Sequence, residues 1–121
     1  MVDKVYIYNR TKNKLIHENA EIANTPFKRS SGLMFRAKQE KPMLFIFDSP
    51  GIYSIHSFFV FFTFDAVYIN EKKEIVEIIK NIKPSSLINP KNISLYLLEI
   101  PTSLSEKLSL SIGDKLEFTR K

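Results

Sequence analysis

The sequence predicts a mainly β fold: a compact single-domain antiparallel β-sandwich, or a barrel-like (jelly-roll-like) structure, with two short helices. Three observations support this prediction. The chain has 121 residues, 44% of them hydrophobic and 12% aromatic, which suits one domain over residues 1–121 with its own core. Its apolar segments are short and alternate or run continuously, as strands do. We find signals for the start of a helix at two places.

The stretch 55–70 is predicted to lie at the centre of the fold. Half of the ten Phe residues lie between Phe58 and Phe64. Residues 58–62 include no polar side chain, which is typical of a central strand covered on both faces. A membrane span needs roughly 20 apolar residues, so this stretch is too short, and no membrane partner is expected. His56 and Asp65 mark where this core strand meets a polar environment.

Residues 4–23 predict a β-hairpin. In 4–8, Val5 and Ile7 alternate with two Tyr residues, as expected for a first strand. The polar stretch 9–13 follows as a turn. A second strand is expected over 15–23, although polar residues interrupt its apolar pattern.

A short helix is expected over 27–31. Thr25 can cap a helix, and Pro26 is tolerated at the first helical position. Gly32 is expected to end this helix, because glycine adopts the left-handed conformation found after helices. The segment 28–41 is also the most basic part of the chain. Its basic residues are Lys28, Arg29, Arg36, Lys38 and Lys41.

The middle of the chain predicts further strands. Residues 42–47 are apolar and read as a buried strand, ended by the turn signal of 48–51. Beyond the Phe-rich stretch, 74–80 alternates as another strand. The Pro-bounded segment 84–90, rich in Ser and Asn, is expected to be a loop.

The C-terminal part combines two strands and the second helix. A strand is expected over 94–100, closed by Pro101. Ser103 and Glu106 have the spacing of a capping box, in which each side chain satisfies a backbone N–H at the helix start. The last strand is expected over 115–119.

Composition excludes several classes of site. The chain has no Cys, which excludes disulfides, thiolate metal sites and cysteine nucleophiles. Its two His residues cannot form a zinc site with several His ligands. Three Gly residues are too few for a glycine-rich phosphate loop. No cofactor and no metal are therefore expected. The first residues lack the apolar segment of a signal peptide, so a cytoplasmic location is expected.

Four residues are candidates for a ligand site: Arg29, Arg36, His56 and Asp65. The two Arg residues flank the turn at 32–34 and could hold a carboxylate, phosphate or sulfate group. His56 could serve as a general base or a ligand donor, or it could be structural.

The alternative for the acidic residues is an internal role. Asp65 and Glu99 both lie in apolar strands, where an unpaired carboxylate is costly to bury. Each therefore needs a partner. For Asp65, that partner is expected to be Arg36 or a backbone N–H.

A set of motifs resembles the landmarks of the domain-of-unknown-function 192 family and runs, in the right order, from about residue 20 to 118. The motifs are Ala23-x-Thr25, Arg29, Gly32-Leu33-Met34-Phe35-Arg36, Met43-Leu44-Phe45-x-Phe47, His56-Ser57-Phe58-Phe59, Asp65 and Leu98-Glu99. The resemblance implies a compact, mainly β, sandwich-like domain found in archaea and bacteria. It implies no activity, but it places all four candidate residues at motif positions, as one constellation.

Two departures from the family pattern stand out. The family tends to continue the His-Ser-Phe-Phe motif with Met, a basic residue and Phe-Pro, where this chain has 60–63 as Val-Phe-Phe-Thr. A positive charge is therefore missing beside the candidate site. The family also favours Pro-Ala-Gly where this chain has Pro101-Thr102-Ser103.

Three functions fit these features. The preferred one is a non-enzymatic binding module for a small polar or anionic ligand, such as a sugar or a carboxylate. The first alternative is an enzyme that uses His56 and Asp65 as acid and base. The second is a surface for nucleic acid or an acidic partner, formed by the basic segments 10–14 and 28–41 in a chain of net charge +5.

Overall fold

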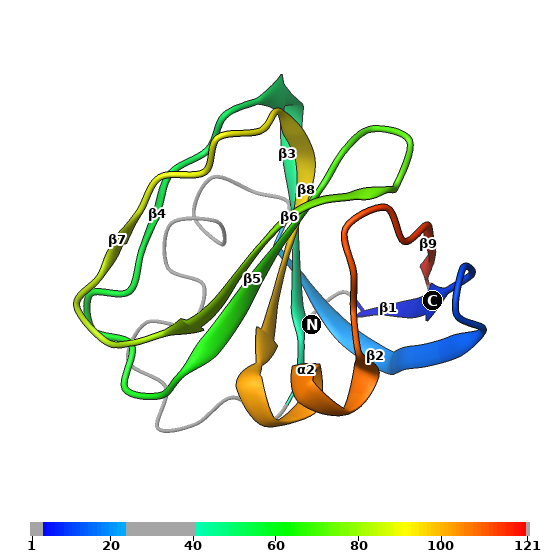
Figure 1. Ribbon diagram of the computed structural model, residues 1–121, viewed down its shortest axis with the longest axis horizontal. Helices are drawn as coiled ribbons and strands as arrows, with labels where there is room; N and C mark the ends of the chain where they lie inside the picture. The colour runs from blue at the N-terminus through cyan, green and yellow to red at the C-terminus, as the bar shows by residue number, and fades with distance from the viewer. Residues whose placement is uncertain (1–3, 24–40, 121) are drawn as a thin grey trace.

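A computed structural model describes residues 4–23 and 41–120 of the chain. Their main feature is one seven-stranded sheet that curls into a half-barrel, with the strand order β6-β5-β8-β3-β2-β1-β9 (Figure 1). Its strands are β1 (Lys4–Asn9), β2 (Lys14–Ala23), β3 (Met43–Gly51), β5 (Phe64–Ile69), β6 (Ile75–Ile82), β8 (Ser94–Pro101) and β9 (Leu116–Arg120). The prediction of a mainly β fold is confirmed.

A separate two-stranded ribbon joins β4 (Ile55–His56) to β7 (Leu87–Ile88). In Figure 1 this ribbon lies beside the curled sheet, on the side opposite β1 and β9. Segment 84–90, expected to be a loop, therefore contains a short strand. No helix within the described ranges is long and apolar enough to cross a membrane.

The predicted N-terminal hairpin is confirmed, because β1 and β2 pair antiparallel. The expectation of a wholly antiparallel fold is wrong, because β2 and β3 pair parallel, with Ile22 opposite Leu44. A parallel pair needs a connection of roughly a dozen residues or more, which residues 24–42 supply. Long-range pairing of this kind leaves no signal in local alternation.

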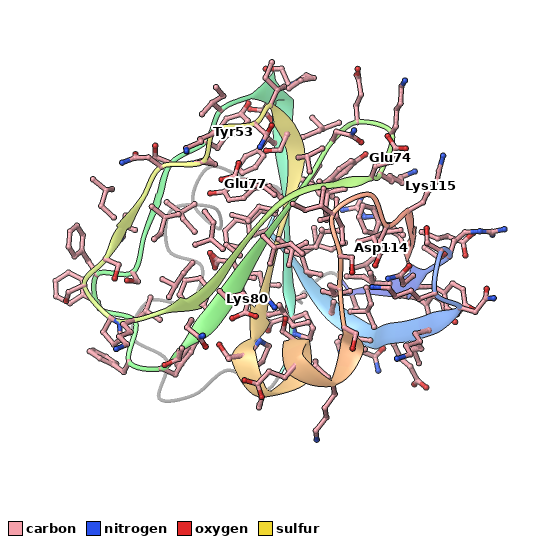
Figure 2. All side chains as sticks on the ribbon, viewed as in Figure 1. Tyr53, Glu74, Glu77, Lys80, Asp114 and Lys115 are labelled. Atoms are coloured by element: carbon pink, nitrogen blue, oxygen red, sulfur yellow. The ribbon has the colours of Figure 1, made fainter. Side chains whose placement is uncertain are left out.

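The sheet curls so far that its two edge strands approach each other, which favours the barrel-like alternative over a two-sheet sandwich. Glu74, just before β6, forms an isolated bridge with Lys115, just before β9 (Figure 2). The amide of Leu116 donates to the carbonyl of Lys73 at 2.8 Å, and the amide of Ile75 donates to the carbonyl of Asp114 at 2.9 Å. Backbone hydrogen bonds thus join the edges at one corner.

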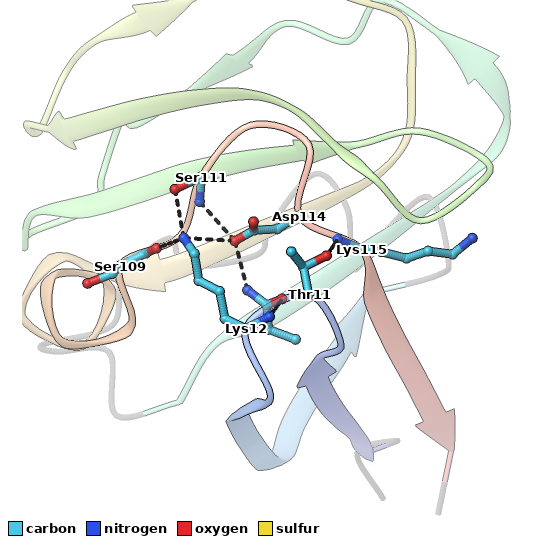
Figure 3. A network of polar contacts seen from close by, with 7 residues as sticks. Thr11, Lys12, Ser109, Ser111, Asp114 and Lys115 are labelled. Atoms are coloured by element: carbon cyan, nitrogen blue, oxygen red, sulfur yellow. Dashed lines mark hydrogen bonds and ion pairs between the residues drawn. The ribbon is translucent and has the colours of Figure 1, made fainter.

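A network of polar side chains lies at the same corner, where the segments before β6 and β9 meet (Figure 3). Asp114 Oδ2 accepts hydrogen bonds from Asn9 Nδ2 at 2.8 Å and from the amide of Ser111 at 3.1 Å. Lys12 Nζ lies 3.1 Å from the same oxygen. The network connects the β1–β2 turn to the loop before β9, and it holds one buried carboxylate with three donors.

The two faces of the sheet carry different cores. The inner face is aliphatic and is covered by the helix α2 (Thr102–Leu108), whose Leu108 joins the cluster. The other face, which we call the aromatic face, is packed against the β4–β7 ribbon and against Val60 and Phe62. Its buried members are Ala23, Met43, Phe45, Val60, Phe64, Ala66, Tyr68, Ile82 and Leu97.

The prediction that Phe58–Phe62 form a buried central strand is wrong. Residues 57–63 are irregular, and β5 begins only at Phe64. Phe58, Phe59 and Phe61 are 47%, 55% and 60% exposed, whereas β5 is buried along its whole length. The buried strand is therefore β5, which follows the run of apolar residues that was predicted to form it.

One of the two expected helices, the C-terminal one, lies within the described residues as α2. The capping box expected from Ser103 and Glu106 is wrong, because the helix begins at Thr102 after Pro101 and has no side-chain cap. The helix expected over 27–31 lies outside the described residues. β3 also continues past the expected turn at 48–51, because Gly51 pairs with Ser94 of β8 after an irregularity.

Candidate functional site

The four residues predicted to bind a ligand are only partly within the described structure. Arg29 and Arg36 lie outside the described residues, as does most of the basic segment 28–41. His56 and Asp65 are described, and they lie in very different environments. His56 is exposed on β4, whereas Asp65 is 1% exposed at the start of β5.

Asp65 has a structural environment. Its Oδ1 accepts a hydrogen bond from the amide of Asn81 at 2.9 Å and another from Thr102 Oγ1 at 2.9 Å. The expectation that this buried carboxylate has a partner is confirmed by the backbone amide, and the alternative partner Arg36 lies outside the described residues. Catalysis by a His56–Asp65 pair requires both groups to face one solvent-open cleft, and a buried carboxylate in this position does not meet that requirement.

His56 lies at the surface of the β4–β7 ribbon. Its Nδ1 accepts a hydrogen bond from the amide of Phe58 at 3.2 Å, and its ring stacks on that of Phe58 with centroids 5.1 Å apart. Across the ribbon it pairs with Leu87. The imidazole therefore stabilises the turn that follows it.

Glu99 is the acidic group with the most perturbed environment in the described residues. It lies in β8, paired with Met43 of β3 and with Ala66 of β5, and only 5% of its surface is exposed. Burial raises the pKa of the Glu99 carboxyl from its ordinary value of 4.5 to about 8. The carboxyl therefore keeps its proton at neutral pH.

Tyr68 lies on the same face as Glu99. Residues opposite each other in antiparallel strands share a face, so the pairs Ala66–Glu99 and Tyr68–Leu97 place both polar side chains on the aromatic face. The Tyr68 hydroxyl donates to the carbonyl of Tyr53 at 2.9 Å. Burial, followed by the nearby Glu99 and Glu77 charges, raises the pKa of the Tyr68 phenol above its ordinary value.

Glu77 on β6 lies directly opposite Tyr68 and is labelled with Tyr53 in Figure 2. Its Oε1 accepts hydrogen bonds from the amides of Lys91 and Asn92, at 2.9 and 3.0 Å. Burial alone would raise the pKa of this carboxyl, but these hydrogen bonds and the Lys91 charge outweigh it, and the pKa is lowered. A charged carboxylate at the edge of the sheet thus accompanies the neutral one at its centre.

The chemistry of this face is that of hydrogen bonding. A protonated carboxyl offers an O–H donor together with acceptor oxygens. Among the residues the structure describes, no group of three or more His, Cys, Asp or Glu side chains could hold a metal ion. Sequence reasoning identified Glu99 as a buried acid in an apolar strand but left it out of the predicted ligand set, and it gave no signal for Tyr68.

Comparison with known families and proteins places the chain clearly. The model of the domain-of-unknown-function 192 family, described as "Uncharacterized ACR", matches residues 7–118. The UPF0127 protein of Pyrococcus furiosus is 33% identical over 114 residues, covering 93% of this chain and 97% of that protein. The UPF0127 protein of Thermococcus sibiricus is 31% identical, covering 93% and 73%.

Two solved structures share the fold. A "putative transcription regulator" of Sinorhizobium meliloti has a TM-score of 0.84 and 25% identity, covering 98% of this chain and 94% of that one. A protein of unknown function from Novosphingobium aromaticivorans has a TM-score of 0.81 and 23% identity, covering 94% and 83%. The curled sheet is therefore a shared architecture.

Proposed function

Because the chain belongs to the domain-of-unknown-function 192 family, whose description assigns no activity, we propose a function from the geometry: a non-enzymatic binding module for a small polar or anionic ligand. The observation that carries this proposal is the buried Glu99 carboxyl, which holds its proton up to a pH of about 8. Strongly perturbed acids concentrate at functional sites.

A neutral Glu99 suits an oxygen-rich ligand. Its O–H can donate to a carboxylate, phosphate or sugar oxygen, and without a negative charge it does not repel an anion. Tyr68 and the aromatic side chains around it are buried on the same face, and apolar side chains of this kind line most small-molecule sites. Arg29 and Arg36 remain predicted ligand contacts, and His56 remains a predicted contact at the surface. A cytoplasmic location also remains a prediction.

The test begins with a thermal-shift screen of sugars, organic acids, phosphates and nucleotides at low salt. A ligand at 100 times its dissociation constant adds about 2.7 kcal/mol to the free energy of unfolding, which is a shift of several degrees for a domain of this size. Binding of an anionic hit should weaken as pH rises through about 8, where Glu99 loses its proton.

The variant Glu99→Gln provides the matched control, because an amide keeps a donor but does not titrate. It should bind the hit with an affinity that stays level across that pH range, while Arg36→Ala should bind more weakly at every pH. If no compound class shifts the melting temperature, or if a hit is indifferent to changes at Glu99, Arg29, Arg36 and His56, the proposal fails.

A second candidate is binding of nucleic acid through the basic segment 28–41. Two observations support it: the net charge of +5, and the name "putative transcription regulator" of the similar Sinorhizobium meliloti protein. The segment 10–14 contributes less, because Arg10 pairs with Glu117 at 3.0 Å and Lys12 pairs with Asp114 at 3.1 Å. Oligonucleotide binding that weakens steeply with salt would support this candidate, and no binding at low salt would remove it.

A further inference from the structure

The residues expected to form the central strand instead build an exposed aromatic surface. We define the Phe tip as Phe58, Phe59, Phe61 and Leu87, whose side chains are 47%, 55%, 60% and 65% exposed. Phe58 and Leu87 are both linked to His56, Phe58 by ring stacking and Leu87 by strand pairing. The Phe tip therefore draws its exposed apolar side chains from two segments that are distant in sequence and that meet at His56.

The backbone beneath the Phe tip is firmly held. Ser57 is fully buried, and its Oγ donates to the carbonyl of Lys83 at 2.5 Å and accepts from the amide of Ser86 at 2.7 Å. The amide of Ser57 also donates to the carbonyl of Ser86 at 2.9 Å. Val60, 3% exposed, anchors the turn in the core. A loop with these contacts presents its Phe side chains in a defined direction.

The Phe tip has features that do not favour folding. Three large aromatic side chains leave much of their surface in water, where they forgo the free energy of burial. Phe59 also has φ of +61°, a left-handed conformation that is unusual for a bulky residue. Both features are consistent with a surface that is used for binding.

The two chain segments that form the Phe tip carry only positively charged side chains of their own. The segments 52–63 and 80–93 contain Lys80, Lys83 and Lys91 and no Asp or Glu. Lys83 is exposed, and its carbonyl accepts the hydrogen bond from Ser57 Oγ. Because Ser57 directly precedes Phe58, the backbone of Lys83 lies close to the Phe tip. Lys91 lies at the other end of this region, close to Glu77.

We propose that the Phe tip inserts into anionic lipid surfaces, with Lys83 contacting the lipid headgroups. Aromatic side chains enter the boundary between headgroups and acyl chains, and nearby Lys residues bind anionic lipids. A protein interface of standard size uses roughly 20–30 residues on each side. Four apolar side chains beside an exposed Lys fit a lipid surface better. This docking needs no spanning segment, and it does not depend on Glu99 or on the proposed ligand.

The test is co-sedimentation of the full chain with phosphatidylcholine vesicles, with and without phosphatidylglycerol. We expect binding to the phosphatidylglycerol vesicles, and weaker binding at high salt because screening reduces the attraction of Lys83. Phe61→Ala should lower partitioning roughly tenfold, as expected for removing an inserted aromatic side chain. Lys83→Glu should lower it on the anionic vesicles only.

Two matched controls separate docking from folding. Ile112→Ala removes a side chain that is 68% exposed outside the Phe tip, and Lys107→Glu reverses an exposed charge on α2, so both should bind vesicles normally. Phe59→Gly should bind vesicles more weakly while its melting temperature stays level or rises, because glycine accepts the left-handed conformation.

Three results would overturn the proposal. The first is the absence of binding to either vesicle, and the second is equal loss of binding in Ile112→Ala and Phe61→Ala. The third is a Phe61→Ala effect seen only on self-association or on binding of single-stranded oligonucleotides, which would assign the Phe tip to a second copy of the chain or to nucleic acid.

Discussion

The carboxylate of Asp65 at the start of β5 accepts a hydrogen bond from the hydroxyl of Thr102, the first residue of α2, at 2.9 Å. The same oxygen accepts the amide of Asn81 on β6. Asn81 has φ of +55° and lies where the β5–β6 register shifts by one residue. One oxygen of Asp65 therefore accepts hydrogen bonds both from the Asn81 amide at the β-bulge of β6 and from Thr102 at the start of α2.

We predict that Asp65→Ala lowers the free energy of unfolding by about 1–3 kcal/mol, since it leaves the Asn81 amide and the Thr102 hydroxyl without their shared acceptor. Asp65→Asn should cost less, because its amide oxygen can still accept. Chemical denaturation of the three proteins measures the difference. If Asp65→Ala is as stable as the native chain, Asp65 has no structural role.

Glu99 predicts a pH dependence of stability. Its pKa is about 8 in the folded state and about 4.5 when ordinarily solvated, so between these pH values the folded chain holds a proton that the unfolded chain has released. Stability must therefore fall as pH rises from about 4.5 to about 8, by roughly 1 kcal/mol per pH unit from this group. The lowered pKa values of Glu77 and Asp114 act below this window, where their contribution is lost as pH falls.

Denaturation curves measured at intervals across this window check the prediction. Glu99→Gln should remove most of the slope, because glutamine cannot release a proton. Glu106→Gln, a change at an exposed position on α2, should leave the slope as it is. Parallel curves for the native chain and Glu99→Gln would mean that Glu99 titrates normally.

Local sequence patterns predicted those elements in which the alternation of apolar and polar residues matches the buried and exposed faces of the element. The β1–β2 hairpin and the 94–100 strand were predicted for this reason, whereas the C-terminal helix was predicted from a capping box that it does not form. The order of the strands and the parallel β2–β3 pair follow from long-range pairing, which periodicity does not report. The family resemblance, carried by motifs such as His56-Ser57-Phe58-Phe59, was confirmed.

In the Phe-rich stretch, the apolar composition does not correspond to burial. A run of apolar residues predicts burial only where those residues serve the core of the fold. Phe58, Phe59 and Phe61 are exposed instead. Among the candidate site residues, burial of a carboxylate correctly predicted a partner for Asp65. It also singled out Glu99, but sequence alone could not tell that burial raises the pKa of the Glu99 carboxyl.

Tyr68 is predicted to stabilise the fold through its hydroxyl. The group is fully buried and donates to the carbonyl of Tyr53 at 2.9 Å, which links β5 to the segment before β4. Tyr68→Phe should lower the free energy of unfolding by about 1 kcal/mol, because the carbonyl loses its donor. Tyr8→Phe is the control, since that side chain is only partly buried and its contact with Asn13 is long, at 3.5 Å.

The Asp114 network predicts an asymmetry between its two charged members. Asp114 is 4% exposed and accepts from Asn9, Lys12 and the amide of Ser111, whereas Lys12 is partly exposed. Burial alone would raise the pKa of the Asp114 carboxyl, but its hydrogen bonds and the Lys12 charge outweigh burial and lower it. Removing the shared acceptor therefore leaves three donors without their partner at a buried oxygen. Removing the lysine instead loses its ion pair with Asp114 and its more exposed hydrogen bonds to the carbonyl of Ser109 and to Ser111 Oγ.

We expect Asp114→Ala to lower the free energy of unfolding by about 3 kcal/mol, and Lys12→Met to lower it by about 1 kcal/mol. The Asp114 contribution should also disappear in acid, because a carboxyl with a lowered folded pKa stabilises the fold above its unfolded pKa and stops doing so as pH falls through the folded value. Denaturation of both variants at neutral pH and in acid tests this. Equal losses at neutral pH would show that the corner where β6 meets β9 depends on the ion pair alone, and not on the buried acceptor.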